Sequence, residues 1–352
     1  MRISYLIAIV SGVSGISQAH DAHLRSRESN GTTESWKDLA QIPDAPRQEH
    51  TAVAINSSTI AIVGGVTGTT ESGAWLNSNL LSLYDIPTNT WTNAAPLPVA
   101  LNHPNAAVVD GKIYLLGGLA ASANETGTWR ATPESWVYDA IHDVWTPTAP
   151  FPLGTERGSA AVGVSGKTIY LAGGLRYIDT STGGTMSTVD EVSAFDTASS
   201  TWTSFPSVPL PQPRDHAGGA VVDNKFYVIG GRHITGRLIV SNTVYVLDLG
   251  DVKAGWTSSS AVLPTARAGH ATAVIGDRIY TFGGEGDLRA SSGVFGQSEV
   301  LYTSTGSSKS LGAMQHPRHG GAGVVVDGAV YIPGGGVAWG ATPVNITDVF
   351  RP

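Results

Sequence analysis

The chain of 352 residues contains no cysteine, and charged residues make up only 14% of it. The absence of cysteine excludes disulfide bonds, although a core of this size can be stable without them. The net charge of -7 is spread along the chain without acidic or basic blocks. We therefore expect no binding to nucleic acid and no attraction to an anionic membrane.

Several enzyme signatures are missing as well. The sequence has no Gly-X-Ser-X-Gly turn for a serine nucleophile, no Gly-X-Gly-X-X-Gly turn for a dinucleotide, no phosphate-binding loop and no His-Glu-X-X-His zinc helix. Cofactor chemistry of the common kinds therefore has no recognisable site, and we expect no cofactor.

The first residues have the pattern of a secretory signal. Arg2 precedes an apolar stretch at residues 3–13, and small residues lead to a cleavage point after Ala19. Because this stretch is too short to span a bilayer, we predict a signal peptide at 1–19, a flexible leader at 20–35, no membrane anchor, and a protein that is secreted or lies in the secretory-pathway lumen. The predicted glycosylation sites are Asn30, Asn56, Asn124 and Asn345.

A pair of glycines recurs six times, at intervals of 51 to 57 residues. Each pair follows a short run of β-branched and aromatic residues, such as 112–116 and 278–282, which predicts a strand. Small aliphatic residues precede that strand, and further strands follow it, one ending on Tyr-Asp or Phe-Asp and one opening on tryptophan. The glycine pairs are Gly64-Gly65, Gly117-Gly118, Gly173-Gly174, Gly230-Gly231, Gly283-Gly284 and Gly334-Gly335, and the tryptophans are Trp91, Trp145, Trp202 and Trp256.

This order of Gly-Gly, Tyr-Asp and Trp resembles the kelch family of β-propellers. The resemblance covers residues 36–352 and implies an all-β, six-bladed kelch propeller in one domain, with four strands per blade. The sixth repeat ends without a fourth strand, whereas Trp36 opens a segment that matches those at Trp91 and Trp145. We therefore predict that the N-terminal strand closes the last blade, which hides the edges of an open array.

The resemblance also carries two exclusions. Galactose oxidase, a secreted relative with this fold, uses copper and a tyrosine crosslinked to cysteine, so a chain without cysteine cannot build that copper-radical site. Plant nitrile-specifier proteins share the fold and hold iron with a cluster of Glu, Asp and His in one loop, and no matching cluster occurs in this sequence.

Five histidines precede the first strands of five repeats. Counted back from the second-strand tyrosine, or from Ala61 in the first repeat, His50, His103 and His216 lie 11 residues upstream, whereas His270 lies 10 and His319 lies 12. Since side chains alternate along a strand, the five imidazoles do not form one ring. The trio of His50, His103 and His216 is a weak candidate for zinc or iron, because no carboxylate is expected at its level; ligand hydrogen bonding and structural roles are the alternatives.

Five arginines and Asn102 recur just before these histidines. Their regularity indicates a scaffold role, whereas irregular positions are where function usually appears. We predict that His103 and His216 are the catalytic residues, acting as acid, base or hydrogen-bond donor. The arginines are Arg47, Arg157, Arg214, Arg267 and Arg318.

The loops after the glycine pairs contain aromatic and basic residues that the repeat does not require. Exposed aromatic side chains in converging loops are typical of a pocket for a flat or lipophilic ligand, although each can also pack under its own loop. The predicted ligand-binding residues are His50, Trp75, Trp129, Arg176, Tyr177, Arg232, His233, Arg289, Phe295 and Trp339.

Three functions from different classes remain open. The first is a cofactor-free cyclase or isomerase, for instance for a cycloaddition, or an accessory protein in natural-product biosynthesis, as the likeness to secreted fungal kelch proteins implies. Its partner would be a lipophilic small molecule of aromatic, terpenoid or polyketide type. The second is a lectin-like carbohydrate binder, and the third is a protein-interaction scaffold. The sequence indicates no oligomeric state.

Overall fold

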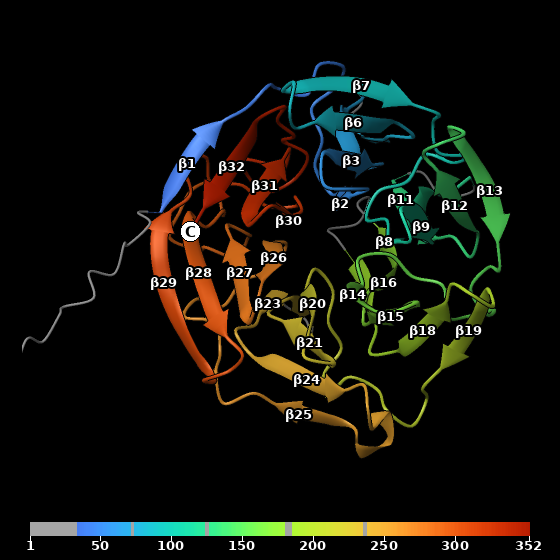
Figure 1. Cartoon of the computed structure of the whole chain (residues 1–352), viewed down its shortest axis with the longest axis vertical. Coiled ribbons are helices and arrows are strands. Elements are labelled where there is room, and N and C mark those ends of the chain that lie inside the picture. The colour runs from blue at the N-terminus through green and yellow to red at the C-terminus, as the bar shows by residue number, and fades with distance from the viewer. Residues whose placement is uncertain (1–33, 72–73, 124–126, 180–184, 235–237) are drawn as a thin grey trace, which may run out of the picture. The chain divides into compact units, whose positions relative to one another are not determined.

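The computed structural model describes residues 34–71, 74–123, 127–179, 185–234 and 238–352. Within residues 34–352, six four-stranded antiparallel sheets surround a common axis, with the first strand of each sheet innermost (Figure 1). This confirms the predicted all-β fold with four strands per blade. The predicted signal peptide, nearly all of the leader, Asn30 and Asn124 lie outside the described residues.

The strands of the first three blades follow one another in the chain. Their bounds are β2 Thr51–Ala54, β3 Thr59–Val63, β6 Leu81–Asp85 and β7 Thr90–Ala94; β8 Ala106–Val109, β9 Lys112–Leu116, β12 Ser135–Asp139 and β13 Val144–Thr148; β14 Ala161–Ser165, β15 Thr168–Ala172, β18 Val192–Asp196 and β19 Thr201–Ser204.

The last three blades repeat the same order. Their bounds are β20 Gly218–Val222, β21 Lys225–Ile229, β24 Val244–Asp248 and β25 Trp256–Ser258; β26 Ala271–Ile275, β27 Arg278–Phe282, β28 Gln297–Tyr302 and β29 Ser307–Ala313; β30 Val324–Val326, β31 Ala329–Pro333, β32 Thr347–Arg351 and, from the start of the chain, β1 Ser35–Asp38.

The N-terminal strand closes the last blade, as predicted. β1 pairs antiparallel with β32, and Trp36 lies opposite Phe350. Its indole also packs edge-on against Phe282 of the fifth blade, with ring centroids 5.6 Å apart. The start and the end of the repeat array are therefore joined by both hydrogen bonds and aromatic contacts.

The tryptophans of the fourth strands connect neighbouring blades. The indole N–H of Trp91 donates to the carbonyl oxygen of Ala40 at 2.8 Å, and that of Trp145 donates to Ala95 at 2.9 Å. Trp202 and Trp256 make the same bond to Ala149 and Val208. A buried indole usually needs such an acceptor, which explains why the repeat keeps tryptophan at this position.

The recurring arginines are buried scaffold residues, as their regularity indicated. Arg318 forms two hydrogen bonds with the carboxylate of Asp348, and Arg267 pairs with Glu299. The second blade differs from the prediction, because Leu101 and not Asn102 occupies the position two residues before the ring residue described below. Asn102 lies one residue further along and pairs with Leu119 in an isolated bridge.

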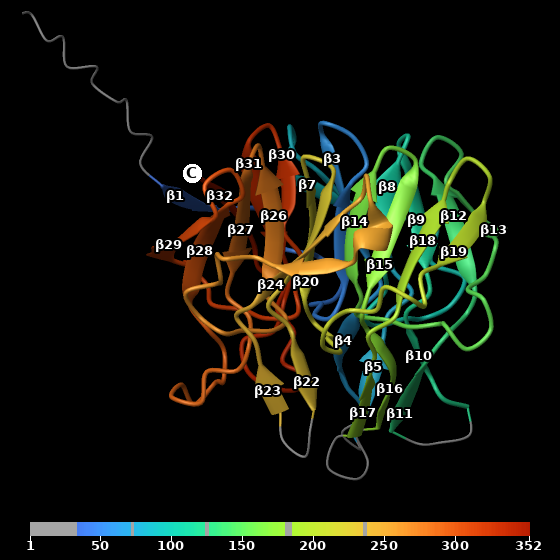
Figure 2. The ribbon, with the colours of Figure 1, turned by 90° about the horizontal axis from the view of Figure 1, so that it is seen from below.

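The segments after the first four glycine pairs form additional strands on one side of the propeller, beyond the blades (Figure 2). β11 and β16 come from the loops of the second and third blades and pair with each other, so one sheet joins two blades.

No helix among the described residues is long and apolar enough to cross a membrane. The extra strands are β4 Val66–Thr69, β5 Trp75–Asn77, β10 Leu119–Ala121, β11 Thr128–Ala131, β16 Leu175–Asp179, β17 Thr185–Thr188, β22 Arg232–Ile234 and β23 Leu238–Val240; one 3-10 helix, η1, spans Val252–Ala254.

Candidate functional site

A ring of six residues surrounds the axis, one from the segment before each first strand. The backbone N–H of His103 donates to Glu49 O at 2.8 Å, that of Ser159 donates to His103 O at 3.0 Å, and the pattern continues around the axis. At one step, the N–H of His216 donates to the hydroxyl oxygen of Ser159 at 3.1 Å. All six residues have a positive φ between 49° and 59°; they are Glu49, His103, Ser159, His216, Gly269 and Gly320.

The ring differs from the predicted histidine trio in one member, because Glu49 stands where His50 was expected. The cause is the first hairpin, in which Val53 pairs with Ala61, whereas Ala107 pairs with Tyr114 in the second blade. The first hairpin is therefore one residue longer, and a count back from the second strand reaches a position one residue too late. The carboxylate that the sequence analysis did not expect at this level is Glu49.

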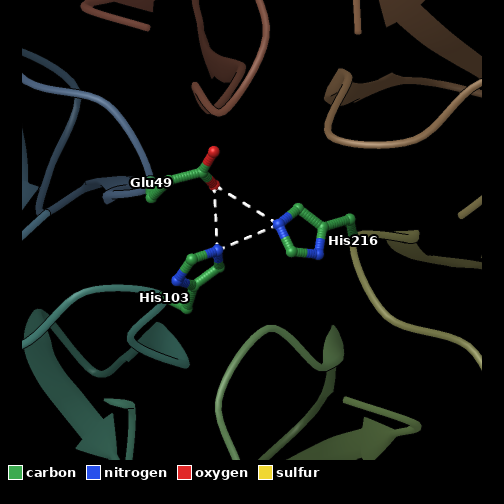
Figure 3. A group of neighbouring side chains, drawn as sticks. All are labelled: Glu49, His103 and His216. Carbon is green, nitrogen blue, oxygen red and sulfur yellow. Dashed lines mark hydrogen bonds and ion pairs between the residues drawn. The ribbon is translucent and has the colours of Figure 1, made fainter. Parts of the chain in front are cut away.

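Glu49, His103 and His216 point toward one another in the centre of the ring (Figure 3). His103 Nε2 lies 2.9 Å from His216 Nε2 and 3.2 Å from Glu49 Oε2, and His216 Nε2 lies 3.6 Å from the same carboxylate oxygen. The three residues are buried, with 7% to 8% of each exposed. Side chains from three blades thus meet at one point on the axis.

The outer nitrogens of both imidazoles are held by neighbouring side chains. His216 Nδ1 lies 2.6 Å from Asp215 Oδ1, and His103 Nδ1 lies 2.5 Å from Asn102 Oδ1. Asp215 also accepts from Arg232 Nε at 2.9 Å and from the Thr188 hydroxyl at 2.5 Å. Each acceptor directly precedes its histidine in the chain, so the dipeptides Asn-His and Asp-His were a usable signal in the sequence.

Further charged residues surround this cluster. Arg232 donates to the Glu285 carboxylate, and Arg232 Nη2 lies 3.2 Å from His216 Nε2. His319 Nδ1 lies 3.6 Å from Glu49 Oε1 and 3.8 Å from Glu285 Oε2. Arg232 follows the fourth glycine pair and Glu285 follows the fifth, which explains how segments after the glycine pairs reach the ring.

The electrostatics of the metal-free cluster place one proton on His216. Burial and Arg232 lower the pKa of His216, but hydrogen bonds to Asp215 and Glu49 outweigh them and raise it to about 9. Burial lowers the pKa of His103, and Glu49 only partly offsets this. Although burial raises the pKa of Glu49, the charges and hydrogen bonds of His103 and His216 hold it well below its usual range.

A cavity of about 460 Å³ extends from the ring along the innermost strands. Its wall is made of small aliphatic residues and glycines, including Ala106, Val162, Gly219 and Ala322. Such a volume suits a small organic molecule. The polar cluster therefore lies at one end of an otherwise mostly apolar channel.

His50 and His270 share a different arrangement, which is structural. His50 Nε2 contacts Pro333 O at 3.0 Å and His270 Nε2 contacts Ile229 O at 3.2 Å, in each case on the neighbouring blade. Burial lowers the pKa of His50 to about 4 and that of His270 to about 3. Both imidazoles are therefore neutral and connect adjacent blades, although His50 also lines the cavity.

The predicted aromatic residues lie in the segments beyond the blades. Trp75 and Trp129 pack against each other with ring centroids 5.1 Å apart, and Trp129 is buried in a hydrophobic cluster. Phe295 is buried over Arg267, and Tyr177 lies over Arg130. Trp339 is 46% exposed and its indole is in close contact with Gly293.

The remaining predicted residues are distributed more widely. Arg232 contacts the cluster directly. Arg176 pairs with Glu191, Arg289 pairs with Asp287 at 3.4 Å, and His233 Nε2 contacts Gln212 at 3.1 Å. Of the predicted glycosylation sites that the structure describes, Asn56 is exposed in a turn and Asn345 is partly buried, donating to Gln41.

The fold and this site can be compared with known proteins. The sequence matches the KLHDC2/KLHL20/DRC7 Kelch-repeats domain over residues 10–231 and 158–335. Kelch-like protein terF of Aspergillus terreus is 40% identical over 321 residues, which are 90% of this chain and 68% of terF. The chain belongs to the kelch-repeat family, and it is related to a fungal member of that family.

More distant relatives show the same repeat. Kelch-like protein 35 of Mus musculus is 28% identical over 231 residues, 65% of this chain and 34% of that protein. Beta-scruin of Limulus polyphemus is 28% identical over 189 residues, 53% of this chain and 19% of that protein. The chain thus spans about two thirds of terF, about a third of Kelch-like protein 35 and about a fifth of beta-scruin.

Proposed function

We propose that this protein binds a lipophilic small molecule in the channel and cyclises or isomerises it by proton transfer at His103 and His216. The supporting observation is the position of the buried Glu49–His103–His216 cluster at one end of a channel lined by small aliphatic residues. The apolar wall would hold the carbon skeleton, and the cluster would meet the polar group of the ligand.

The cluster offers both a proton donor and a proton acceptor. His216, with a pKa of about 9, carries a proton at neutral pH, and the Glu49 carboxylate is ionised. A ligand with a carbonyl or enol oxygen at the ring would accept a hydrogen bond from the His216 imidazolium, while Glu49 or His103 would take a proton from it. Channel walls that hold one reactive conformer would supply the remainder of the catalysis.

The proposed setting is natural-product biosynthesis in the secretory pathway or outside the cell. The 40% identity to the Kelch-like protein terF of Aspergillus terreus supports a fungal-type protein, the apolar channel supports a lipophilic ligand, and the secretory signal expected at 1–19 supports the compartment. The proposed ligand is accordingly an aromatic, terpenoid or polyketide molecule.

The test compares product profiles. The full-length protein and its His216→Gln variant are incubated with metabolite extracts of the organism that encodes them, and the products are separated by mass spectrometry. We expect at least one metabolite to be consumed by the wild type and not by His216→Gln, whereas the exposed-histidine control His142→Gln should behave as wild type. Identical profiles for protein and buffer would refute the proposal.

A further inference from the structure

The three inward-facing atoms of the cluster have the geometry of metal ligands. Their separations are 2.9, 3.2 and 3.6 Å. Ligands about 2.1 Å from one ion, at angles of roughly 85–120°, lie about 2.8–3.6 Å apart. Two imidazole nitrogens and one carboxylate oxygen are a common ligand set for zinc and for ferrous iron.

The outer contacts prepare both histidines for this role. His216 Nδ1 donates to the Asp215 carboxylate and His103 Nδ1 donates to Asn102 Oδ1. When an ion displaces the Nε2 proton of His216, each Nε2 turns a lone pair toward the axis. Metal-bound histidines commonly donate their second N–H to a carboxylate or carbonyl oxygen, which fixes the tautomer. Lone pairs of His103 and His216 and a carboxylate oxygen of Glu49 then meet with no side-chain proton between them in this tautomeric state.

His319 provides an independent observation. Its Nε2 contacts Ala338 O at 2.9 Å, whereas its Nδ1 has no hydrogen-bond partner among the described residues, although the residue is only 3% exposed. With the proton on Nε2, the Nδ1 lone pair faces Glu49 Oε1 at 3.6 Å and Glu285 Oε2 at 3.8 Å. His319 Nδ1, Glu49 Oε1 and Glu285 Oε2 thus form a second group of acceptor atoms beside the three proposed ligand atoms. Within the described part of the chain, no cation or proton donor lies between His319 Nδ1 and these two carboxylate oxygens in this tautomer.

The charges around the cluster leave room for a divalent cation. The carboxylates of Glu49, Asp215 and Glu285 face a single guanidinium, that of Arg232, so two negative charges remain when the imidazoles are neutral. Buried charges without partners are costly, and a divalent ion would balance these two. Arg232 Nη2, at 3.2 Å from His216 Nε2, is the competing donor and can satisfy only one of the three ligand atoms.

We propose that Glu49 Oε2, His103 Nε2 and His216 Nε2 bind one divalent first-row transition-metal ion, with the channel side of the ion open to a ligand. The inference rests on the proposed function only in sharing its cavity. A bound ion would occupy both Nε2 atoms, so a Lewis acid would replace proton transfer by His103 and His216 at the position where the polar group of the substrate would lie. This favours substrates that can coordinate through a carbonyl or enolate oxygen. Asp215 and Asn102 act as positioning residues.

The test measures metal binding without any substrate. Full-length protein without a histidine tag is stripped with dipicolinate and titrated with Zn²⁺ by calorimetry and with Co²⁺ by visible absorption. We expect about one ion per chain, and an absorption band of bound Co²⁺ that indicates nitrogen and oxygen ligands. Zn²⁺ should also raise the midpoint of thermal unfolding of the wild type.

Variants locate the ion. Asp215→Asn removes an outer partner and should weaken Zn²⁺ affinity about 10–100-fold. Glu49→Gln and His103→Gln each remove a ligand, and should therefore weaken Zn²⁺ affinity at least about 100-fold. The controls His270→Gln, a buried histidine outside the cluster, and His142→Gln should bind as wild type. If a ligand variant does not fold, the Co²⁺ spectrum of Asp215→Asn tests the site instead and should shift.

Two results would overturn the inference: less than a tenth of an ion bound per chain at excess Zn²⁺, or binding that Glu49→Gln and Asp215→Asn leave unchanged. The proposed function fails separately. Stripped protein that still converts a metabolite would retain the proton-transfer function without the metal, and metal-loaded protein that converts nothing would retain the metal site without the function.

Discussion

Four of the six ring residues adopt a left-handed backbone conformation without being glycine. Glu49, His103, Ser159 and His216 have φ values of 52°, 49°, 55° and 53°. A non-glycine residue in this region costs about 1 kcal/mol or more, and such residues often occur at functional sites. The backbone hydrogen bonds of the ring hold the conformation, which directs these side chains toward the axis.

The two glycines of the ring allow a matched test of this view. Gly320→Ala and Gly269→Ala should each lower the free energy of unfolding by about 1 kcal/mol, since their φ values of 59° and 58° are nearly equal. A Cβ at Gly320 would lie 2.5 Å from Glu49 Oε1, whereas at Gly269 the nearest atom is 3.6 Å away. Only Gly320→Ala should therefore displace Glu49 and weaken Zn²⁺ binding.

Denaturant unfolding and Zn²⁺ calorimetry on both variants measure the two effects. Equal Zn²⁺ affinity in Gly320→Ala and Gly269→Ala would show that Glu49 is not held where the ring places it.

His270 connects two blades as a neutral imidazole, and its burial lowers its pKa from the ordinary 6.5 to about 3. Between these values the unfolded chain binds a proton that the folded protein does not. Stability from this residue is thus complete above pH 6.5 and is lost as the pH falls toward 3, by about 1.4 kcal/mol per pH unit. Relative to His270→Gln, the wild type should lose about 2–3 kcal/mol more between pH 7 and 4.5.

Urea unfolding of both proteins at the two pH values is the measurement. The comparison cancels the acid sensitivity of the carboxylates, which both proteins share. Parallel pH profiles would mean that His270 takes up a proton in the folded protein as readily as in the unfolded chain, contrary to its burial.

At the scale of elements, the four-residue strand β1 closes the ring of blades. Its four residues supply the outer strand of the last blade, and Trp36 reaches Phe350 and Phe282 of two blades. The other blades take all four strands from one continuous stretch of chain. The last blade instead joins the two ends of the described chain, so weakening β1 should affect the whole propeller.

We expect Trp36→Ala to destabilise the protein by about 2–3 kcal/mol, somewhat less than the loss of a fully buried tryptophan because Trp36 is only partly buried. Lys37→Ala on the same strand is exposed and should have little effect. Thermal unfolding of the two variants under identical conditions makes the comparison. A change below about 0.5 kcal/mol for Trp36→Ala would contradict a closing role for this strand.

For the whole molecule, the closed ring brings together residues that are far apart in the chain. Glu49, His103 and His216 belong to the first, second and fourth blades, and they meet because each blade presents the same backbone position to the axis. The repeated tryptophans connect neighbouring blades, whereas the repeated arginines connect strands within their own blade. The site forms at the ring position, where the residue type differs from blade to blade: the six blades carry a glutamate, two histidines, a serine and two glycines there.

The sequence alone determined the blade number, the closing strand and the scaffold role of the repeated arginines, because each depends on a local pattern that recurs along the chain. It also indicated His103, His216 and Arg232, which the structure brings together. Only the tertiary structure showed that Glu49, and not His50, joins them. One extra residue in the first hairpin makes a count back from the second strand end at His50, whereas a count of two residues forward from the recurring arginine ends at Glu49. The two counts disagree, and only the backbone pairing of the folded blades decides between them.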